Sequence, residues 1–164
     1  MSKQSQDVYL VDAVRTPFGK AGSLYSETRA DDLVVRAIRG LLDRNPRLPQ
    51  ERIDEVAIAA ATQTGDQGLT IGRTAALLAG LPLTVPGYAI DRMCAGALTA
   101  VTTAASAIGF GAIDIAIAGG VEHMGRHPMG EGADPNPRFL AENIVQQDAL
   151  IMGCLLYTSD AADE

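Results

Sequence analysis

Cys94 is the side chain of this sequence best placed to act as a nucleophile. It follows a short apolar run, residues 88–90, and lies near the start of a stretch from residue 93 to 113 without any charged side chain. If that stretch is helical, Cys94 stands at its amino end, where backbone N–H groups and the helix dipole favour a thiolate and can hold an oxyanion. The alternative is a small buried cysteine that only packs against its neighbours.

The two histidines are weaker candidates for a site. His123 and His127 are four residues apart, a spacing that places two metal ligands on one face of a helix. Pro128, the neighbouring glycines and the lack of a third ligand favour a loop, so we predict no metal site. The glycine pairs near residues 110 and 120 lack the G-x-G-x-x-G spacing of a dinucleotide loop, and none is predicted.

Composition limits the classes of function. The 164 residues carry 13 Lys+Arg against 20 Asp+Glu, a net charge of -7, which excludes the basic surface that a nucleic-acid partner needs. The two cysteines, Cys94 and Cys154, form no C-x-x-C pair, so neither a disulfide framework nor a zinc ribbon is predicted. With a polar amino terminus and no signal-peptide core, we expect a cytoplasmic protein.

The uncharged stretch is long enough to cross a bilayer, but Ala, Gly, Thr and Ser make up most of it. It has too few strongly apolar residues for a membrane span, and we predict none. We interpret it instead as the buried central helix of a folded domain, packed on every side. Its predicted apolar stripe consists of Leu98, Val101, Ala105 and Ile108.

Four apolar runs predict β-strands. The first is rich in β-branched residues and stops before Pro17 and Gly19; the runs are residues 8–14, 55–61, 88–90 and 113–118. Helical periodicity separates them: one helix covers residues 33–42 after a capping box from Thr28 to Asp31, and a second covers residues 71–79 and ends at Gly80. The uncharged helix is the third.

The predicted order, β-α-β-α-β-α-β, indicates an α/β fold with a parallel or mixed sheet and helices on both faces. In such sheets chemistry occurs at the carboxyl ends of strands, here the turns after Val14, Ala61, Ile90 and Ala118. Proline and glycine beyond Gly120 predict an irregular excursion, with a further helix over residues 139–152.

Several segments resemble the thiolases. Residues 91–98, D-R-M-C-A-G-A-L, resemble the active-site segment of that family. Residues 15–20, 79–87 and 118–124 resemble further thiolase segments in the same order and spacing. The resemblance covers about residues 8–153, and the V-E-H-M form is most similar to the 3-ketoacyl-CoA thiolases of bacterial fatty-acid oxidation complexes.

The resemblance implies acyl transfer in two steps. The Cys94 thiolate attacks the 3-keto carbon of a 3-oxoacyl-CoA, acetyl-CoA leaves as its enolate, and coenzyme A then takes the acyl group from Cys94. Coenzyme A is thus a co-substrate, no bound cofactor is expected, and Cys94 is the catalytic residue with its backbone N–H as one oxyanion donor. Where the family usually has Ser-Gly or Ser-Ser, this chain has Gly96 and Ala97, which keep the small size but lose a hydroxyl.

A family thiolase is more than twice this length, and its activating histidine and second cysteine lie in the later half. The resemblance therefore implies an N-terminal portion that is inactive alone. We expect a thiolase N-terminal α/β domain over residues 1–121, the start of a loop domain over 122–153, and a foreign tail over 154–164.

The full-length parent is expected to act on acyl-CoA substrates, to form a homo-oligomer and to be able to bind a hydratase/dehydrogenase subunit. Two alternatives stay open. The first is a ketoacyl synthase-type condensing enzyme, and the second is a non-catalytic assembly module in which Cys94 is a packed core residue.

Overall fold

A three-stranded parallel sheet organises the chain, as seen in a computed structural model that describes residues 6–144. The central strand is β1 (Glu55–Ala59), flanked by β2 (Gly87–Ile90) and β3 (Ala116–Gly120) in the order β2-β1-β3. Val56 is paired with Gly87 on one side and with Ile117 on the other. Of the parallel or mixed sheet predicted, the parallel form is observed among the described residues, with strands close to the expected runs.

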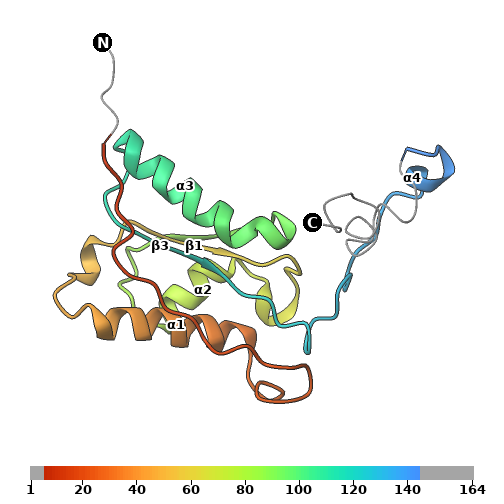
Figure 1. The fold of residues 1–164 in the computed structure, drawn as a ribbon, viewed down its shortest axis with the longest axis horizontal. Helices are drawn as coiled ribbons and strands as arrows, with labels where there is room; N and C mark the ends of the chain where they lie inside the picture. Colours follow the sequence, from red (N-terminus) through yellow and green to blue (C-terminus); the bar gives the residue numbers. More distant parts are fainter. Residues whose placement is uncertain (1–5, 145–164) are drawn as a thin grey trace, which may run out of the picture. The chain divides into compact units, whose positions relative to one another are not determined.

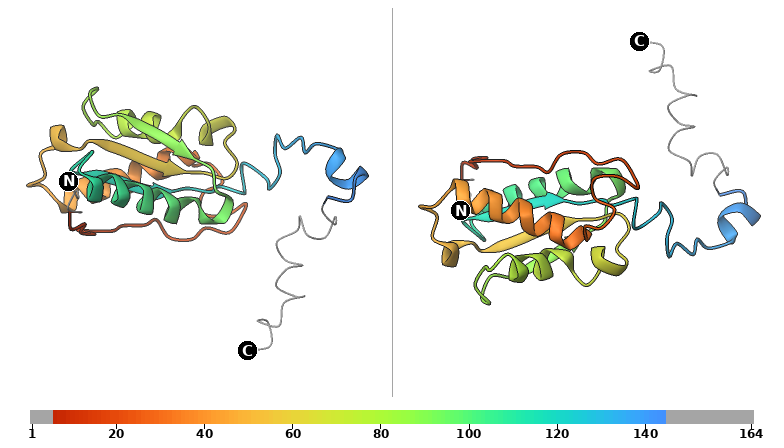
Figure 2. Two further views of the ribbon diagram at one scale, coloured as in Figure 1. Left: turned by 90° about the horizontal axis from the view of Figure 1, so that it is seen from above. Right: turned by 90° about the horizontal axis from the view of Figure 1, so that it is seen from below.

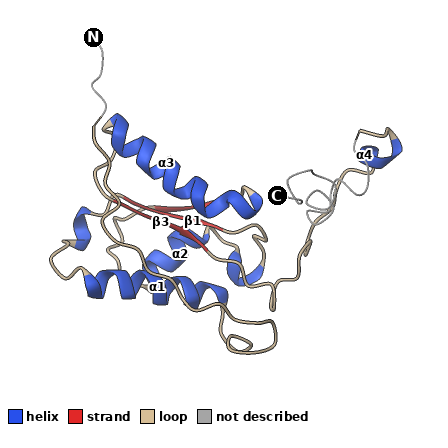
Figure 3. Cartoon of the chain, viewed as in Figure 1, coloured by secondary structure: helices blue, strands red, loops and turns tan. Residues whose placement is uncertain are grey.

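Helices cover both faces of this sheet, as predicted. Helices α1 (Ala30–Arg44) and α2 (Ile71–Leu78) lie on one face, and α3 (Gly96–Phe110) lies on the other (Figure 1, Figure 2). Short 3-10 helices precede β1, α2 and α3; they are η1 (Gln50–Arg52), η2 (Gly65–Gln67) and η3 (Met93–Ala95). Figure 3 shows the same alternation of helices and strands along the chain.

The core lies between the sheet and the α1–α2 layer. Apolar residues at helical spacing on α1 face the buried side of β1, and Gly80, with φ +90°, ends the α2 segment in the left-handed conformation expected of it. The core cluster consists of Val34, Val35, Ile38, Ile53, Val56, Ile58, Ile71, Ala75, Ala76, Leu81, Val85 and Ile117.

The chain divides into two compact units, Met1–Glu131 and Gly132–Glu164. The second contains the short helix α4 (Arg138–Ala141), and its Arg138 pairs with Glu142 at the C-cap. This helix coincides with the start of the predicted helix over 139–152; the rest of that prediction, and the foreign tail over 154–164, lie outside the described residues. The domain boundaries at 121 and 153 stay predictions.

The prediction of a strand at residues 8–14 is wrong. This segment carries no strand assignment, and Val11 is 84% exposed. It is tied down by Asp12, whose carboxylate pairs with Arg44 at 2.9 Å and accepts from Asn45 Nδ2 at 2.8 Å. β-Branched residues favour an extended backbone, but a strand also needs a partner for its ladder of hydrogen bonds. The observed order therefore begins with α1.

The predicted capping box is also wrong. The N-cap of α1 is Arg29, and no side chain caps the helix there. The Asp31 carboxylate instead accepts from Arg29 Nε at 2.9 Å and Arg29 Nη2 at 2.7 Å, so it does not reach back to Thr28. The last strand is displaced from residues 113–118 to β3. Asp54 Oδ2 accepts from the backbone N–H groups of Asp114 and Ile115, just before the point where the pairing of β3 with β1 begins.

Helix α3 is not buried on every side, contrary to the prediction. Its buried residues are Gly96, Ala100 and Ala104, at intervals of four, and they form one narrow face of small side chains. Leu98 of the predicted stripe is 68% exposed and Val101 is 37% exposed. The face against the sheet is set by how closely the backbones approach, and small residues allow the closest approach.

Among the described residues, Met93–Phe110 is a stretch whose length and composition alone would allow it to cross a membrane. This stretch includes α3, however, and the contact of the small-residue face of α3 with the sheet is typical of a helix in a folded α/β domain. The absence of a membrane span stays a prediction.

Replacement of Gly96 tests the close approach of α3. A Cβ at Gly96 would lie 2.8 Å from Ala59 Cβ, so Gly96→Ala should lower the free energy of unfolding by about 1–3 kcal/mol, as overpacking does. Gly40→Ala is the matched control because a Cβ at Gly40 of α1 meets no atom within 4 Å, and it should gain about 0.5–1 kcal/mol from helix propensity. Urea unfolding measures both, and equal stabilisation would contradict the contact.

Candidate active site

The carboxyl ends of the three strands lie at one edge of the sheet, where η2, the start of α3 and the segment after β3 meet (Figure 1). Ala60 N donates to Ile90 O at 3.1 Å, and Val121 N donates to Ala59 O at 2.9 Å. The turns predicted to carry chemistry after Ala61, Ile90 and Ala118 are thus together.

The fourth predicted turn, after the first apolar run, connects to this edge through Tyr25. The Tyr25 hydroxyl donates to Pro17 O at 3.0 Å, and the Tyr25 carbonyl oxygen lies 2.9 Å from His123 Nε2. Within the turn, the Arg15 guanidinium stacks 3.8 Å over the ring centroid of Phe18. The turn is therefore anchored to the segment after β3 rather than to a strand of its own.

Cys94 lies in a sharp turn between β2 and α3. It is exposed, and η3 places it two residues before the first residue of α3. Its position at the amino end of the uncharged helix is as predicted, and the alternative in which Cys94 is a packed core residue is wrong for this structure. An exposed thiol at this position can reach a substrate from solvent.

The backbone of this turn is strained next to Cys94. Met93 has φ +48°, in the left-handed region that residues with a Cβ rarely adopt, and Met93 N donates to Asp91 Oδ1 at 3.0 Å. Such strain persists only where the surroundings hold it, and it gathers at functional sites. This strain could not be predicted from the sequence, because methionine carries no signal for a positive φ.

Two glycines hold the Cys94 turn against the strand ends. Gly96 faces Ala59 at the end of β1, and a Cβ at Gly120 would lie 2.9 Å from Ala97 Cβ and 3.1 Å from Ala59 O. The small size inferred for Gly96 is therefore needed, since a larger side chain there would push α3 off the sheet.

Gln67 joins the loops after β1 and β3, and sequence reasoning missed it. Its side chain is fully buried; Nε2 donates to Thr62 O at 2.8 Å and to Glu122 Oε1 at 2.9 Å, while Oε1 accepts from His123 N at 2.6 Å. Glu122 Oε2 in turn accepts from Ala61 N at 2.8 Å. A polar residue in the loop after a buried strand was the available signal, but Glu122 and His123 lie 55 and 56 residues away from it.

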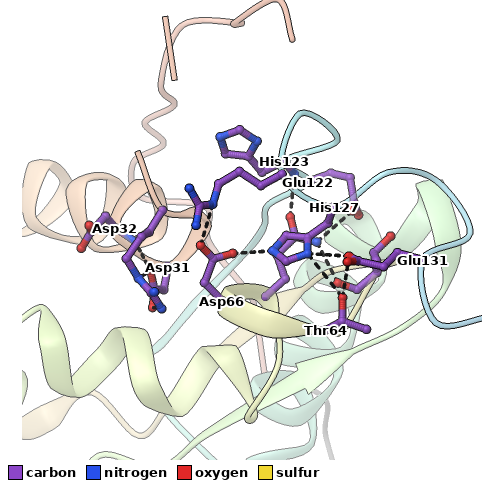
Figure 4. Close-up of polar contacts among 12 residues, drawn as sticks. Asp31, Asp32, Thr64, Asp66, Glu122, His123, His127 and Glu131 are labelled. Carbon is purple, nitrogen blue, oxygen red and sulfur yellow. Dashed lines mark hydrogen bonds and ion pairs between the residues drawn. The ribbon is translucent and has the colours of Figure 1, made fainter. Parts of the chain in front are cut away.

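Asp66, beside Gln67, makes a second connection to the same segment (Figure 4). Its carboxylate accepts from Arg126 Nε at 3.0 Å and lies 2.5 Å from His127 Nε2. Burial disfavours the charged carboxylate, but hydrogen bonds from His127 and from the Ala30 backbone outweigh burial and hold the pKa of Asp66 below its usual value. The predicted loop position of both histidines is confirmed, and their rings have separate partners.

Relief of the strain at Met93 tests the turn before Cys94. The side chain is exposed, so Met93→Gly should raise the free energy of unfolding by about 1 kcal/mol, because glycine adopts a positive φ without a steric penalty. Met124→Gly is the control, since Met124 is also exposed but has no positive φ, and it should not be stabilising. A destabilising Met93→Gly in urea unfolding would show that the turn is not strained.

Loss of the Gln67 amide should separate the loops. Gln67→Leu leaves Glu122 Oε1, His123 N and Thr62 O without this partner, and we expect a loss of about 2–4 kcal/mol in thermal or urea unfolding. Gln63→Leu is the matched control: the Gln63 side chain is exposed and donates to Ala60 O at 3.2 Å, so its loss should stay below about 1 kcal/mol. Equal losses would contradict the role of Gln67.

Comparison with known proteins places this arrangement in a family. The family model described as "Thiolase, N-terminal domain" matches residues 8–162. A β-ketoadipyl-CoA thiolase of Pseudomonas knackmussii is 45% identical over 124 residues, 76% of this chain and 31% of that protein. A 3-ketoacyl-CoA thiolase of Saccharophagus degradans is 44% identical over 138 residues, 84% of this chain and 35% of that protein.

A solved structure supports the same family. The crystal structure of the Bacillus anthracis acetyl-CoA acetyltransferase superposes with a TM-score of 0.71 at 31% sequence identity, covering 82% of this chain and 36% of that one. The chain thus spans about a third of the length of the relatives it matches. The family match extends to residue 162, so it marks no boundary at Gly153. With this fold and these relatives, the chain belongs to the thiolase family of acyltransferases.

Proposed function

We propose that the chain is the N-terminal portion of a thiolase that cleaves 3-oxoacyl-CoA with coenzyme A, with Cys94 as the nucleophile. The observation that carries the proposal is the exposed Cys94 in the strained turn that opens α3. An amino end of a helix supports a thiolate and an oxyanion through its N–H groups and dipole. Family membership supplies the acyl-transfer chemistry.

The reaction divides into two exchanges at one sulfur. In the first, the Cys94 thiolate bonds to the 3-keto carbon, the bond between the second and third carbons breaks, and the enolate of acetyl-CoA leaves and takes a proton. In the second, the thiolate of coenzyme A bonds to the acyl carbon and the Cys94 thiolate leaves. A thioester suits this exchange because it remains reactive toward a second thiol. The Cys94 backbone N–H is proposed as one oxyanion donor.

The two histidines of the described residues have partners of their own. Both ring nitrogens of His127 face carboxylates, and His123 Nε2 lies 2.9 Å from Tyr25 O. This supports the proposal that the remaining catalytic groups come from the rest of a longer parent, and that these 164 residues are inactive alone. The exposed Leu98 and Val101 of α3 support the same proposal, because an apolar helix face favours burial against further protein.

The parent is proposed to be a cytoplasmic homo-oligomer that acts on acyl-CoA substrates and that can bind a hydratase/dehydrogenase subunit. β-Ketoadipyl-CoA is a second candidate substrate, since a relative of that name is 45% identical. The Pseudomonas knackmussii and Saccharophagus degradans relatives are named as thiolases, which favours cleavage over the decarboxylating condensation of a ketoacyl synthase-type enzyme.

Thiolysis assays test this proposal. A full-length protein that contains these residues should cleave acetoacetyl-CoA, and Cys94→Ala should lower kcat/KM by at least about 10³-fold, because the nucleophile is lost. A panel with β-ketoadipyl-CoA separates the two substrates, and a malonyl-dependent assay detects condensation. Retained thiolysis in the full-length Cys94→Ala variant would overturn the role of Cys94.

The 164-residue chain alone should show no thiolysis above background. Cys94→Ala in the same chain is the control for uncatalysed cleavage. Turnover by the 164-residue chain that Cys94→Ala abolishes would refute the proposed incompleteness while supporting Cys94 as the nucleophile.

A further inference from the structure

His127 is buried between two carboxylates. Its Nε2 lies 2.5 Å from Asp66 Oδ1, and its Nδ1 lies 2.6 Å from Glu131 Oε2 (Figure 4). A neutral imidazole has a single N–H, so one of its nitrogens would turn a lone pair toward a carboxylate oxygen. The imidazolium has two N–H groups and donates to both. The geometry therefore fits a doubly protonated ring.

The two carboxylates come from different parts of the chain. Asp66 lies in η2, after β1, while His127 and Glu131 lie on the segment after β3. Glu131 Oε2 also accepts from Thr64 Oγ1 at 2.9 Å, so both ends of the cluster connect the β3 segment to the turn over residues 64–67. Gly65 allows the ring to approach, since a Cβ there would lie 2.6 Å from His127 Cε1.

Charge balance in the cluster depends on the ring proton. Arg126 pairs with Asp66 at 3.0 Å, so two cations face two carboxylates when His127 is protonated. The other charged groups near the cluster are Arg29, Asp31 and Asp32 at the start of α1 and Glu122 after β3. Loss of the ring proton leaves one carboxylate unbalanced, and the Asp66 side chain is only 3% exposed.

We propose that protonated His127 is a latch that holds residues 123–131 on the turn after β1, and that its deprotonation releases Glu131. The contact between His127 and Glu131 is the one that breaks, because the Glu131 side chain is 42% exposed and can be hydrated. Asp66 is buried and retains its contact with Arg126. The latch goes beyond the acyl-transfer proposal and does not depend on it. The latch makes the attachment of residues 123–131 to the turn after β1 sensitive to pH.

The sign of the pH dependence follows from the partners of the ring. Burial disfavours the imidazolium, but the hydrogen bonds to Asp66 and Glu131 outweigh burial and raise the pKa of His127 above its usual value of 6.5. A group whose pKa is raised by folding stabilises the folded state fully below its unfolded pKa, and this contribution is lost as the pH rises through the folded pKa. The latch is therefore fully closed below the usual imidazole pKa of 6.5 and opens as the pH rises through the raised pKa of His127.

Hydrogen–deuterium exchange of the 164-residue chain between pH 6 and 9 tests the latch. The reporters are the amides of His127 and Glu131, which donate to His123 O and Pro128 O. After correction for intrinsic exchange, their protection should fall by about tenfold or more as the pH rises, while peptides from α1 and β1 stay protected. Protection that is constant across the range, or an unprotected α/β unit throughout, would overturn the proposal.

Three variants test whether the His127 ring causes the pH-dependent loss of amide protection. His127→Gln should abolish it, leaving exchange of residues 123–131 fast at every pH. Glu131→Gln keeps an acceptor oxygen but removes its charge, so it should retain the transition at a lower pH. His123→Gln is the matched control, because the His123 ring contacts the carbonyl oxygen of Tyr25, and the transition should remain as in the parent chain. An unchanged transition in His127→Gln would contradict the latch.

Discussion

The contact between the small-residue face of α3 and the sheet is the constraint on which the candidate active site depends. Gly96, Ala100 and Ala104 are the buried residues of this helix, so its backbone approaches the strands more closely than larger side chains would allow. The tightest point, Gly96 against Ala59, lies two residues after Cys94. The position of the Cys94 turn relative to the strand ends therefore follows from the packing of the helix.

Buried polar groups complete the same edge of the sheet. Asp66 and Gln67 are neighbours in η2, and each bonds to the segment that leaves β3. Among residues 6–144, no buried side-chain nitrogen or oxygen lacks a hydrogen-bond partner. Fully paired polar networks specify one arrangement, since an unpaired buried group is costly. The loops around the start of α3 are thus held by directional bonds, as a preorganised site requires.

Local patterns predicted most of the fold, and the errors share a cause. The apolar runs of β1 and β2 and the periodicity of α1 and α2 are properties of contiguous residues, so they could be recognised in the sequence. The strand predicted over residues 8–14 is wrong because β-propensity does not supply a partner strand. The burial predicted for all sides of α3 is wrong because hydropathy does not say which neighbours cover a helix. Cys94 could be found from its place before the uncharged helix, whereas Gln67 could not, since its partners come from a distant segment.

The exposure of Cys94 in the folded chain can be measured by the reactivity of its thiol. Brief treatment with iodoacetamide under native conditions, followed by peptide mass mapping, compares Cys94 with Cys154 and with a urea-unfolded sample. We expect Cys94 to be alkylated while peptides of the core remain protected from proteolysis, because the close packing of α3 presents the thiol to solvent. A Cys94 that reacts only after unfolding, while Cys154 reacts in the folded chain, would contradict this expectation.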